Sequence, residues 1–339
     1  QAKNSNTFVI KTSNVVSGSI TRSQVWKADG TEDQILYASD AAASDGFGRS
    51  VSVDGDYAIV GALGGLAAYI FYKSGGTWTQ QAILTGSDTG SSDEFGGEVS
   101  IKGDYAVVAA RGNNSYAGAA YVFVRSGTNW TQQQKLTTSD TAGSDKLSRC
   151  SIDGDYIILG AWGAPGGAHT GAAYIFMRSG TSWTQQQKIL ASDIQASDQF
   201  GYSVSISGDY AIVGAYLEDT GGSEAGATYI FKREGTTWSE QIKLTASDRQ
   251  ADDQFGYSVS LSGDYAIVGA WQEDTGGSNA GAAYIFKRSG TSWTEQSKLL
   301  ASDAQASDNF GRRVSINDGI AVVGSIYEDT GGSNVGAAY

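Results

Sequence analysis

The chain has 339 residues, of which 46 are glycine and one is proline, and its formal charge at neutral pH is −13. This acidic balance argues against a nucleic-acid or anionic-membrane partner, because both need a basic surface. The single cysteine, Cys150, excludes an internal disulfide framework. No apolar stretch reaches the ~20 residues of a membrane helix.

The N-terminal part of the chain predicts an extension followed by a strand pair. A first residue of Gln1 rather than methionine is expected of a secreted chain whose leader has been removed. Residues 1–20 are a β-prone extension, either a loose tail or a strand that pairs with another subunit. Residues 25–40, VWKADGTEDQILYASD, align with residues 285–303, IFKRSGTSWTEQSKLLASD, after a short deletion. We therefore expect residues 21–339 to form one domain that begins with the last two strands of a unit.

A unit of four short strands recurs along the rest of the chain, with a period of roughly 50 residues. In one copy SVSIS and YAIVGA are joined by Gly208-Asp209, a typical hairpin turn, and ATYIFKR precedes WSEQIKL. Such a repeat predicts an all-β protein, a β-propeller of four-stranded antiparallel blades. The units begin near six anchor residues: Phe47, Phe95, Leu147, Phe200, Phe255 and Phe310.

The two ends of the chain predict how the ring closes. The last unit stops at Tyr339, as its third strand begins, and the N-terminus carries a third and fourth strand. Sharing these strands in one closing blade leaves no free edge and favours six blades. Seven blades are the alternative, if residues 7–20 are a worn first and second strand.

The runs FGYSVSISGDYAIVGA and FGYSVSLSGDYAIVGA resemble FG-GAP repeats, the blade units of integrin α-subunit propellers and of many secreted or surface proteins of microbes. The resemblance covers about residues 40–339. It implies a propeller used outside the cell for adhesion or ligand binding, and no particular reaction. Integrin-type blades often carry a calcium loop, DxDxDG, between the first two strands. Here that turn is SGDY or DGDY, too short to wrap an ion, so calcium is not carried over to this position.

Acidic loops gather on the face where strand 2 leads to strand 3 and strand 4 leads to the next strand 1. Two aspartates precede each anchor at a constant spacing, so they either fix the turn by accepting backbone N–H bonds or bind a cation. Calcium is the expected ion, because only oxygen ligands are offered. The candidate metal ligands are Asp193, Asp198, Asp248, Asp253, Asp303 and Asp308. The EDTGGS loops, expected to be exposed, add candidate ligand-binding carboxylates: Glu218, Asp219, Glu273, Asp274, Glu328 and Asp329.

Tryptophans occur at two kinds of position. Those that open the fourth strand, such as Trp183 and Trp238, are expected to pack between blades, whereas Trp162 and Trp271 follow strand 2 and are candidate ligand contacts. The opposite face carries lysine and arginine in its turns, so discs with unlike faces could stack. Asn113 and Asn129 each begin an N-x-S/T glycosylation pattern.

These observations predict a non-enzymatic, secreted or cell-surface propeller for adhesion, ligand binding or surface assembly, with a protein or carbohydrate ligand. His169, the only histidine, has no repeated partner nearby, and near-identical carboxylates in every unit indicate architecture rather than catalysis. Two alternatives stay open. One is a filament or layer subunit that polymerises through its N-terminal strand or its charged faces. The other is a glycan-active enzyme that uses paired carboxylates on the acidic face.

Overall fold

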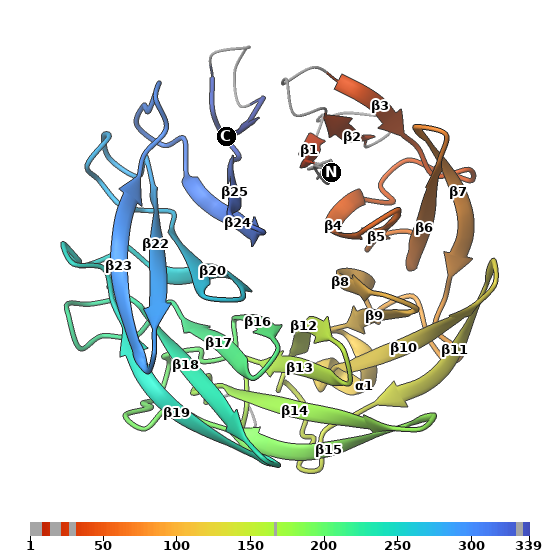
Figure 1. Cartoon of the computed structure of the whole chain (residues 1–339), viewed down its shortest axis with the longest axis horizontal. Coiled ribbons are helices and arrows are strands. Elements are labelled where there is room, and N and C mark those ends of the chain that lie inside the picture. Colours follow the sequence, from red (N-terminus) through yellow and green to blue (C-terminus); the bar gives the residue numbers. More distant parts are fainter. Residues whose placement is uncertain (1–8, 14–21, 27–31, 166–167, 330–334) are drawn as a thin grey trace.

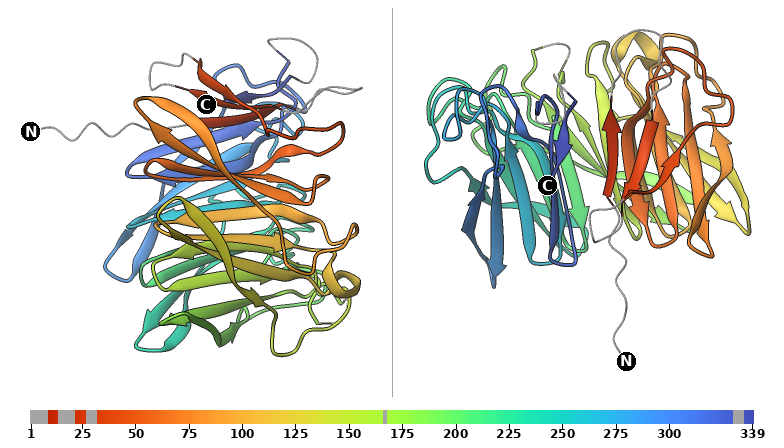
Figure 2. Two further views of the ribbon diagram at one scale, coloured as in Figure 1. Left: turned by 90° about the vertical axis from the view of Figure 1, so that its right-hand side faces the viewer. Right: turned by 90° about the horizontal axis from the view of Figure 1, so that it is seen from above.

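The computed structural model describes residues 9–13, 22–26, 32–165, 168–329 and 335–339. Its antiparallel sheets stand around a common centre, with one edge of each sheet toward that centre and the other at the rim (Figure 1). Seen from the side, the connecting loops lie at two opposite faces of the ring (Figure 2). The predicted β-propeller of four-stranded antiparallel blades is confirmed.

Five sheets have four strands, ordered from the centre to the rim as they follow in the chain. They are β4 (Phe47–Asp54), β5 (Tyr57–Ala62), β6 (Ala67–Ser74) and β7 (Thr77–Leu84); β8 (Phe95–Lys102), β9 (Tyr105–Ala110), β10 (Ala119–Ser126) and β11 (Asn129–Leu136); β12 (Leu147–Asp153), β13 (Tyr156–Ala161), β14 (Ala172–Ser179) and β15 (Ser182–Ile189); β16 (Ser203–Ser207), β17 (Tyr210–Ala215), β18 (Ala227–Glu234) and β19 (Thr237–Leu244); and β20 (Phe255–Ser262), β21 (Tyr265–Ala270), β22 (Ala282–Ser289) and β23 (Ser292–Leu299).

Two further sheets, at the ends of the described chain, have three strands each. The first contains β1 (Val9–Ser13), β2 (Arg22–Trp26) and β3 (Glu32–Leu36), and the last contains β24 (Phe310–Asn317), β25 (Ile320–Ser325) and β26 (Ala337–Ala338). The only helix among the described residues, α1 (Asn113–Tyr116), is a single short turn. No helix in this part of the chain is long and apolar enough to cross a membrane.

The ends of the chain differ from the predicted closure. Strands β3 to β26 form six successive repeats of four strands, as the period predicts. However, the described terminal strands do not share a blade: β2 pairs with β1 and β3, while β25 pairs with β24 and β26. In each sheet a neighbour close in sequence already occupies the edge that the predicted closure reserved for the other end, and such local pairing costs less chain entropy. The alignment behind the prediction is nevertheless confirmed, because β2 and β3 have the bulge after Val25 that β22 and β23 have after Ile285.

Both faces of the middle strands are buried, as expected for sheets packed between neighbouring sheets. Tyr229, Ile230 and Phe231 of β18 are successive residues that point to alternate faces, and all three are buried. Each sheet therefore buries apolar side chains against the sheet before it and the sheet after it. These contacts, repeated around the ring, form the core.

Glycine allows the sheets to approach closely near the centre. A Cβ placed on Gly214, the penultimate residue of β17, would lie 2.1 Å from the carbonyl oxygen of Gly256 in the next sheet. Gly61, Gly160 and Gly269 meet the next sheet in the same way. The glycine of VGA in one sheet thus contacts the glycine of FG in the next sheet, and neighbouring sheets meet at these two residues.

Serines of the inner strands link neighbouring sheets by hydrogen bonds. The Oγ of Ser205 in β16 accepts the backbone N–H of Leu261 in β20 at 3.1 Å, and the Oγ of Ser151 accepts that of Ile206 at 3.2 Å. The serine in the middle of strand 1 therefore places a hydroxyl beside the inner edge of the next sheet in each of the first five units. These bonds satisfy edge N–H groups that strand pairing leaves free.

Candidate ligand-binding site

The repeat varies most where strand 1 begins and where strand 2 ends, and these positions converge near the centre of the ring. The residue after each anchor pair, phenylalanine-glycine in most units, is Tyr202 in one sheet, Tyr257 in the next and Arg312 in the last. The residues that follow strand 2 on the face of the acidic loops include Trp162, Tyr216 and Trp271. We call Trp162, Tyr202, Tyr216, Tyr257 and Trp271 the aromatic cluster.

The aromatic cluster is continuous from one sheet to the next. The ring centroid of Tyr202 lies 5.8 Å from that of Trp162, 4.3 Å from that of Tyr216 and 4.9 Å from that of Tyr257. Tyr257 lies 5.3 Å from Trp271. The Tyr202 hydroxyl donates to the Tyr257 hydroxyl at 3.0 Å. Two tryptophans singled out in the sequence are thus joined through tyrosines into one surface.

Arginines cover the faces of these rings. The guanidinium of Arg149 lies 4.7 Å from the ring centroid of Tyr202, and that of Arg312 lies 4.4 Å from Trp271 and 5.1 Å from Tyr257. These distances are within the range of a favourable cation–π contact. We call the aromatic cluster together with Arg149, Arg312 and Arg313 the central site.

The electrostatics of the central site are positive, although the whole chain is acidic. Burial acts to raise the pKa of Tyr257, but the hydrogen bond from Tyr202 and the charges of Arg312, Arg313 and Arg149 together lower it. Arg149 donates to Glu98 at 2.8 Å. Among the described residues, Arg312 and Arg313 have no carboxylate partner. The central site therefore combines flat apolar rings with uncompensated cations.

A cavity of about 90 Å³ adjoins the cluster between the inner strands of neighbouring sheets. Trp162, Tyr202 and Arg149 line it together with Glu94 and Arg111, which form an ion pair at 2.6 Å. This volume holds a few waters or a small polar group. The cavity therefore extends the central site and does not enclose a large ligand.

Sequence reasoning selected only Trp162 and Trp271 from the central site. It missed the tyrosines and arginines, although a signal was present, because the two positions after the FG pair change from unit to unit while the FG pair itself and strand 2 change little. A variable position inside a constant repeat indicates freedom from the packing that holds the repeat together. That freedom is what a binding surface needs.

The expectation that the EDTGGS glutamates are exposed is wrong. Glu218, Glu273 and Glu328 are buried, with exposures of 1%, 1% and 3%. Glu218 Oε1 lies 2.9 Å from the ammonium of Lys243 and accepts the backbone N–H of Thr220 at 2.8 Å. Burial opposes ionisation, but these bonds lower the pKa of Glu218. The glutamates thus anchor their loops from inside.

The aspartates of the EDTGGS loops lie at the surface and shape their own loops. Asp219 Oδ1 accepts the backbone N–H of Glu224 at 2.7 Å, and Asp274 Oδ1 accepts that of Asn279 at 2.8 Å. Asp329 is also exposed. These carboxylates lie on the loops that follow strand 2, on the same face as Trp162 and Trp271.

The two aspartates before each anchor have different contacts. The first accepts from a tyrosine hydroxyl and a lysine, as Asp193 does from Tyr229 at 2.8 Å and Lys243 at 2.6 Å. The second, such as Asp198, accepts a backbone N–H of its own loop at 2.7 Å. Asp248 and Asp253 repeat this pattern; Asp308 accepts from its own loop and Asp303 from Tyr339. Within the described ranges no three His, Cys, Asp or Glu side chains are placed to hold a metal. Calcium at these aspartates stays a prediction.

The second aspartates make stability depend on pH. Burial, together with Glu218 and other carboxylates, raises the pKa of Asp198 to about 6, and Asp253 behaves alike. Their stabilising protonated form is fully present below the unfolded-state pKa of about 3.9 and is lost as the pH rises through 6. Asp198→Asn keeps an oxygen acceptor and removes the charge. We expect it to raise the free energy of unfolding at pH 8 by about 1–2 kcal/mol, and much less at pH 4.5.

Urea titrations at both pH values measure this effect. Asp193→Asn is the control from the same loop, because Lys243 and Tyr229 outweigh burial and lower the pKa of Asp193. Its carboxylate stabilises the fold above the unfolded-state pKa, so its loss should destabilise at pH 8. Equal shifts for Asp198→Asn at both pH values would contradict the assignment.

The lysines and arginines expected on the opposite face are present, but its recurring arginines are paired. Each recurring arginine of its strand 3–4 turns pairs with an aspartate of a strand 1–2 turn: Arg125 with Asp104, Arg178 with Asp155, Arg233 with Asp209 and Arg288 with Asp264. The arginines also cover tyrosines of the preceding sheet, as Arg233 covers Tyr156 at 4.6 Å. The charge contrast between the two faces is therefore smaller than predicted.

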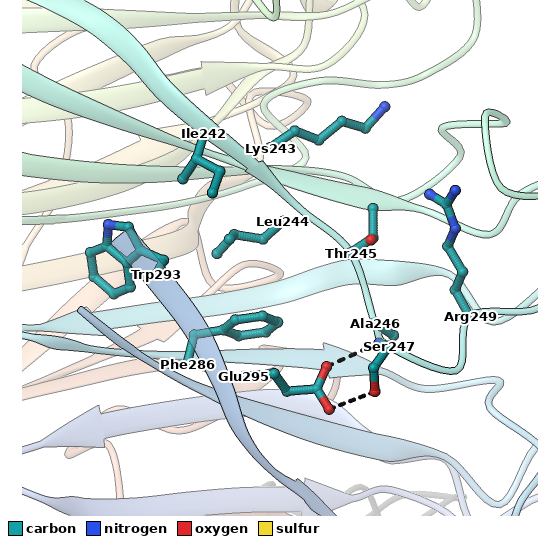
Figure 3. A pocket seen from close by; sticks show the side chains of 10 residues that line it. All are labelled: Ile242, Lys243, Leu244, Thr245, Ala246, Ser247, Arg249, Phe286, Trp293 and Glu295. Carbon is teal, nitrogen blue, oxygen red and sulfur yellow. Dashed lines mark hydrogen bonds between the residues drawn. The ribbon is translucent and has the colours of Figure 1, made fainter. Parts of the chain in front are cut away.

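The tryptophans that open the fourth strands pack between sheets. Trp183, Trp238 and Trp293 are buried. A glutamine of the preceding sheet bonds to the backbone of each of the first two: Gln187 in β15, for example, donates to the Trp238 carbonyl at 2.7 Å and accepts the Trp238 backbone N–H at 2.8 Å. At β19 Ile242 replaces this glutamine. A groove of about 440 Å³ lies there between β19 and β23, with the Ser247 to Glu295 hydrogen bonds at its edge (Figure 3).

The two predicted glycosylation positions differ in access. Asn113 is buried and its side-chain nitrogen donates to Asp93 at 2.8 Å, so that nitrogen is not free for a glycan. Asn129, the first residue of β11, is exposed. Asn129 is therefore accessible in the folded chain and Asn113 is not, and glycosylation at either position stays a prediction.

The comparison of repeat sequences decides the family. The FG-GAP repeat family matches residues 31–71, 78–123, 130–176, 183–231, 238–286 and 293–339. The chain belongs to the FG-GAP repeat family. Each matched FG-GAP unit from the second onward starts at the tryptophan of a fourth strand and ends in the third strand of the following sheet. An FG-GAP unit therefore spans two sheets.

Solved structures agree with this fold at low sequence identity. A putative 6-phosphogluconolactonase from Bacteroides fragilis has a TM-score of 0.56 at 13% identity, with 88% of this chain and 82% of that chain covered. One from Bacteroides uniformis has a TM-score of 0.58 at 13% identity with the same coverage. U3-55K has a TM-score of 0.58 at 9% identity, with 97% of each chain covered. No curated protein matches the sequence. These likenesses concern the fold alone.

Proposed function

We propose that this FG-GAP chain is a non-enzymatic, extracellular propeller that binds a surface ligand at the central site. The observation that carries the proposal is the position of the aromatic cluster. The FG-GAP framework is nearly constant from unit to unit, and its sequence diverges where Trp162, Tyr202, Tyr257 and Trp271 meet. Aromatic side chains supply large contact area at low cost in conformational entropy, and they dominate many binding surfaces.

The remaining repeated polar groups support a scaffold role. A lysine binds the first aspartate in four of the loops, a tyrosine adds a bond as Tyr229 does to Asp193, and the second aspartate binds its own backbone. His169 packs on Trp162 with ring centroids 5.7 Å apart, so it belongs to the wall of the cluster. This division between a repeated frame and an aromatic surface confined to three neighbouring sheets favours recognition as the task of the protein.

A carbohydrate and protein array tests the proposal. We expect Trp162→Ala and Trp271→Ala each to weaken binding of the retained ligand about tenfold or more, because each removes an aromatic contact. Tyr37→Ser is the control, since Tyr37 is 45% exposed and follows β3 at the rim. Retention that survives both tryptophan variants would refute a ligand at the central site.

The same array separates the alternatives. Turnover of an arrayed sugar would replace the binding proposal with a glycan-active enzyme. Sedimentation at several protein and salt concentrations would reveal a filament subunit, which should form large species more readily at low salt if charged faces drive assembly.

A further inference from the structure

We infer that the central site recognises a saccharide through a single carboxylate, as in a terminal acidic sugar on an otherwise uncharged glycan. The inference rests on the proposed function, since it names the ligand class of the same site. Its first support is the excess of cations. Arg149, Arg312 and Arg313 all act on Tyr257. Of the carboxylates beside the site, Glu98 is already bonded to Arg149 and Glu224 to Gln254.

Arginine is suited to a carboxylate because its planar guanidinium presents paired N–H donors. Arg312 is held in position by its contacts with Trp271 and Tyr257, so little side-chain entropy remains to be lost on binding. Arg313 is exposed on the neighbouring position of β24. Arg312 therefore offers a guanidinium in a fixed position, and Arg313 offers one that can adjust to the ligand.

The acidic surroundings limit the number of charges that a ligand can carry. Asp219, Asp274 and Asp329 are exposed on loops of the same face, and the whole chain has a formal charge of −13. A polyanion would meet repulsion along its length outside the central site. A ligand with one terminal carboxylate and a neutral body places its charge at the arginines and avoids that repulsion.

The polar groups of the site favour a saccharide over a peptide. The hydroxyls of Tyr202 and Tyr257 lie beside the aromatic rings, an arrangement suited to sugar hydroxyls and the apolar face of a sugar ring. Gln254 and Ser148 accept the indole N–H groups of Trp271 and Trp162 and so hold these rings in place. A peptide could instead add to an inner strand edge. However, the N–H groups of Leu261, Val314 and Ile316 already donate to serines of the preceding sheet.

Titration with three small probes tests the inference: methyl β-glucuronide, methyl β-glucoside and N-acetylglycine. We expect the glucuronide to bind at least tenfold more tightly than the other two, measured by protein-observed NMR. Arg313→Gln and Arg312→Gln should each reduce glucuronide affinity several-fold more than they reduce glucoside affinity. Arg249→Gln, on an outer loop of the same face, is the matched control and should change neither.

The outcomes distinguish this inference from the proposed function. Equal affinity for glucuronide and glucoside, or no binding of either, would overturn the inference that the site recognises a carboxylate. In that case, tryptophan-dependent retention of neutral glycans on the array would still support ligand binding at the central site. Equal affinity for N-acetylglycine and glucuronide overturns the saccharide and indicates a peptide C-terminus. Because Arg312 packs on two rings, its variant needs an unchanged NMR spectrum away from the site; Arg313→Gln, at an exposed position, gives an independent reading.

Discussion

Replacing Gly214 by alanine is expected to destabilise the propeller by about 3 kcal/mol or more. The new Cβ would lie 2.1 Å from the Gly256 carbonyl oxygen and 2.3 Å from the Ser203 Oγ. The carbonyl belongs to the backbone of the next sheet, so the two sheets must separate and lose packed contacts on both sides. Urea unfolding followed by tryptophan fluorescence, together with soluble yield, measures the loss.

Gly90→Ala is the control for this change. Gly90 lies in a loop, needs no left-handed backbone, and its nearest neighbour to an added Cβ is an Asp93 oxygen at 4.0 Å. Alanine there should alter the free energy of unfolding by less than about 0.5 kcal/mol. Similar unfolding midpoints for the two variants would show that the sheets are not held at this distance.

Lys243→Met is expected to cost about 3 kcal/mol, because it leaves the charge of Glu218 buried without its cation. Lys188→Met is the matched control. Lys188 occupies the equivalent position in β15, and its one ion pair among the described residues is with Asp140, whose side chain is 44% exposed. Loss of such an exposed pair should cost less than about 1 kcal/mol. Thermal and urea unfolding of both variants give the comparison.

A second substitution separates the buried charge from the lost packing of the lysine. Glu218→Gln in the Lys243→Met background removes the unpaired charge, so it should restore a large part of the lost stability. An additive effect of the two substitutions would mean that Lys243 contributes by packing alone. Such a result would also mean that the Lys243 ammonium does not offset the cost of burying Glu218.

The frame of the molecule could be predicted from the sequence because its signals are local. Alternating strands, the Gly208-Asp209 turn and the match between Val25 and Ile285 each depend on a few neighbouring residues, and each agrees with the structure. The burial of Glu218 could not be predicted in this way. Its loop is polar and rich in glycine. The cation that permits its burial, Lys243, lies in β19, the second strand after that loop.

The central site was only partly predictable for a related reason. Trp162 and Trp271 stand out as large residues at the start of variable loops, but Tyr202 and Tyr257 follow the FG glycine in strands whose other residues pack. Whether these side chains contact one another depends on how far each sheet is rotated from the next. The sequence of a single repeat does not determine that rotation. Likewise, the pairing of Arg233 with Asp209 joins two turns that lie far apart in the sequence of the unit.

The offset of the FG-GAP unit across two sheets also bears on how such a chain can lengthen during evolution. The first strand of a duplicated unit is the fourth strand of the preceding sheet. Its other three strands form the next sheet, whose fourth strand comes from the following unit. Every new copy thus contains both glycines, of FG and of VGA, through which sheets contact each other. It also contains both the serine and the backbone N–H that form the hydrogen bonds between sheets. FGYSVSISGDYAIVGA and FGYSVSLSGDYAIVGA differ at one position, so neighbouring copies can remain nearly identical where the sheets meet.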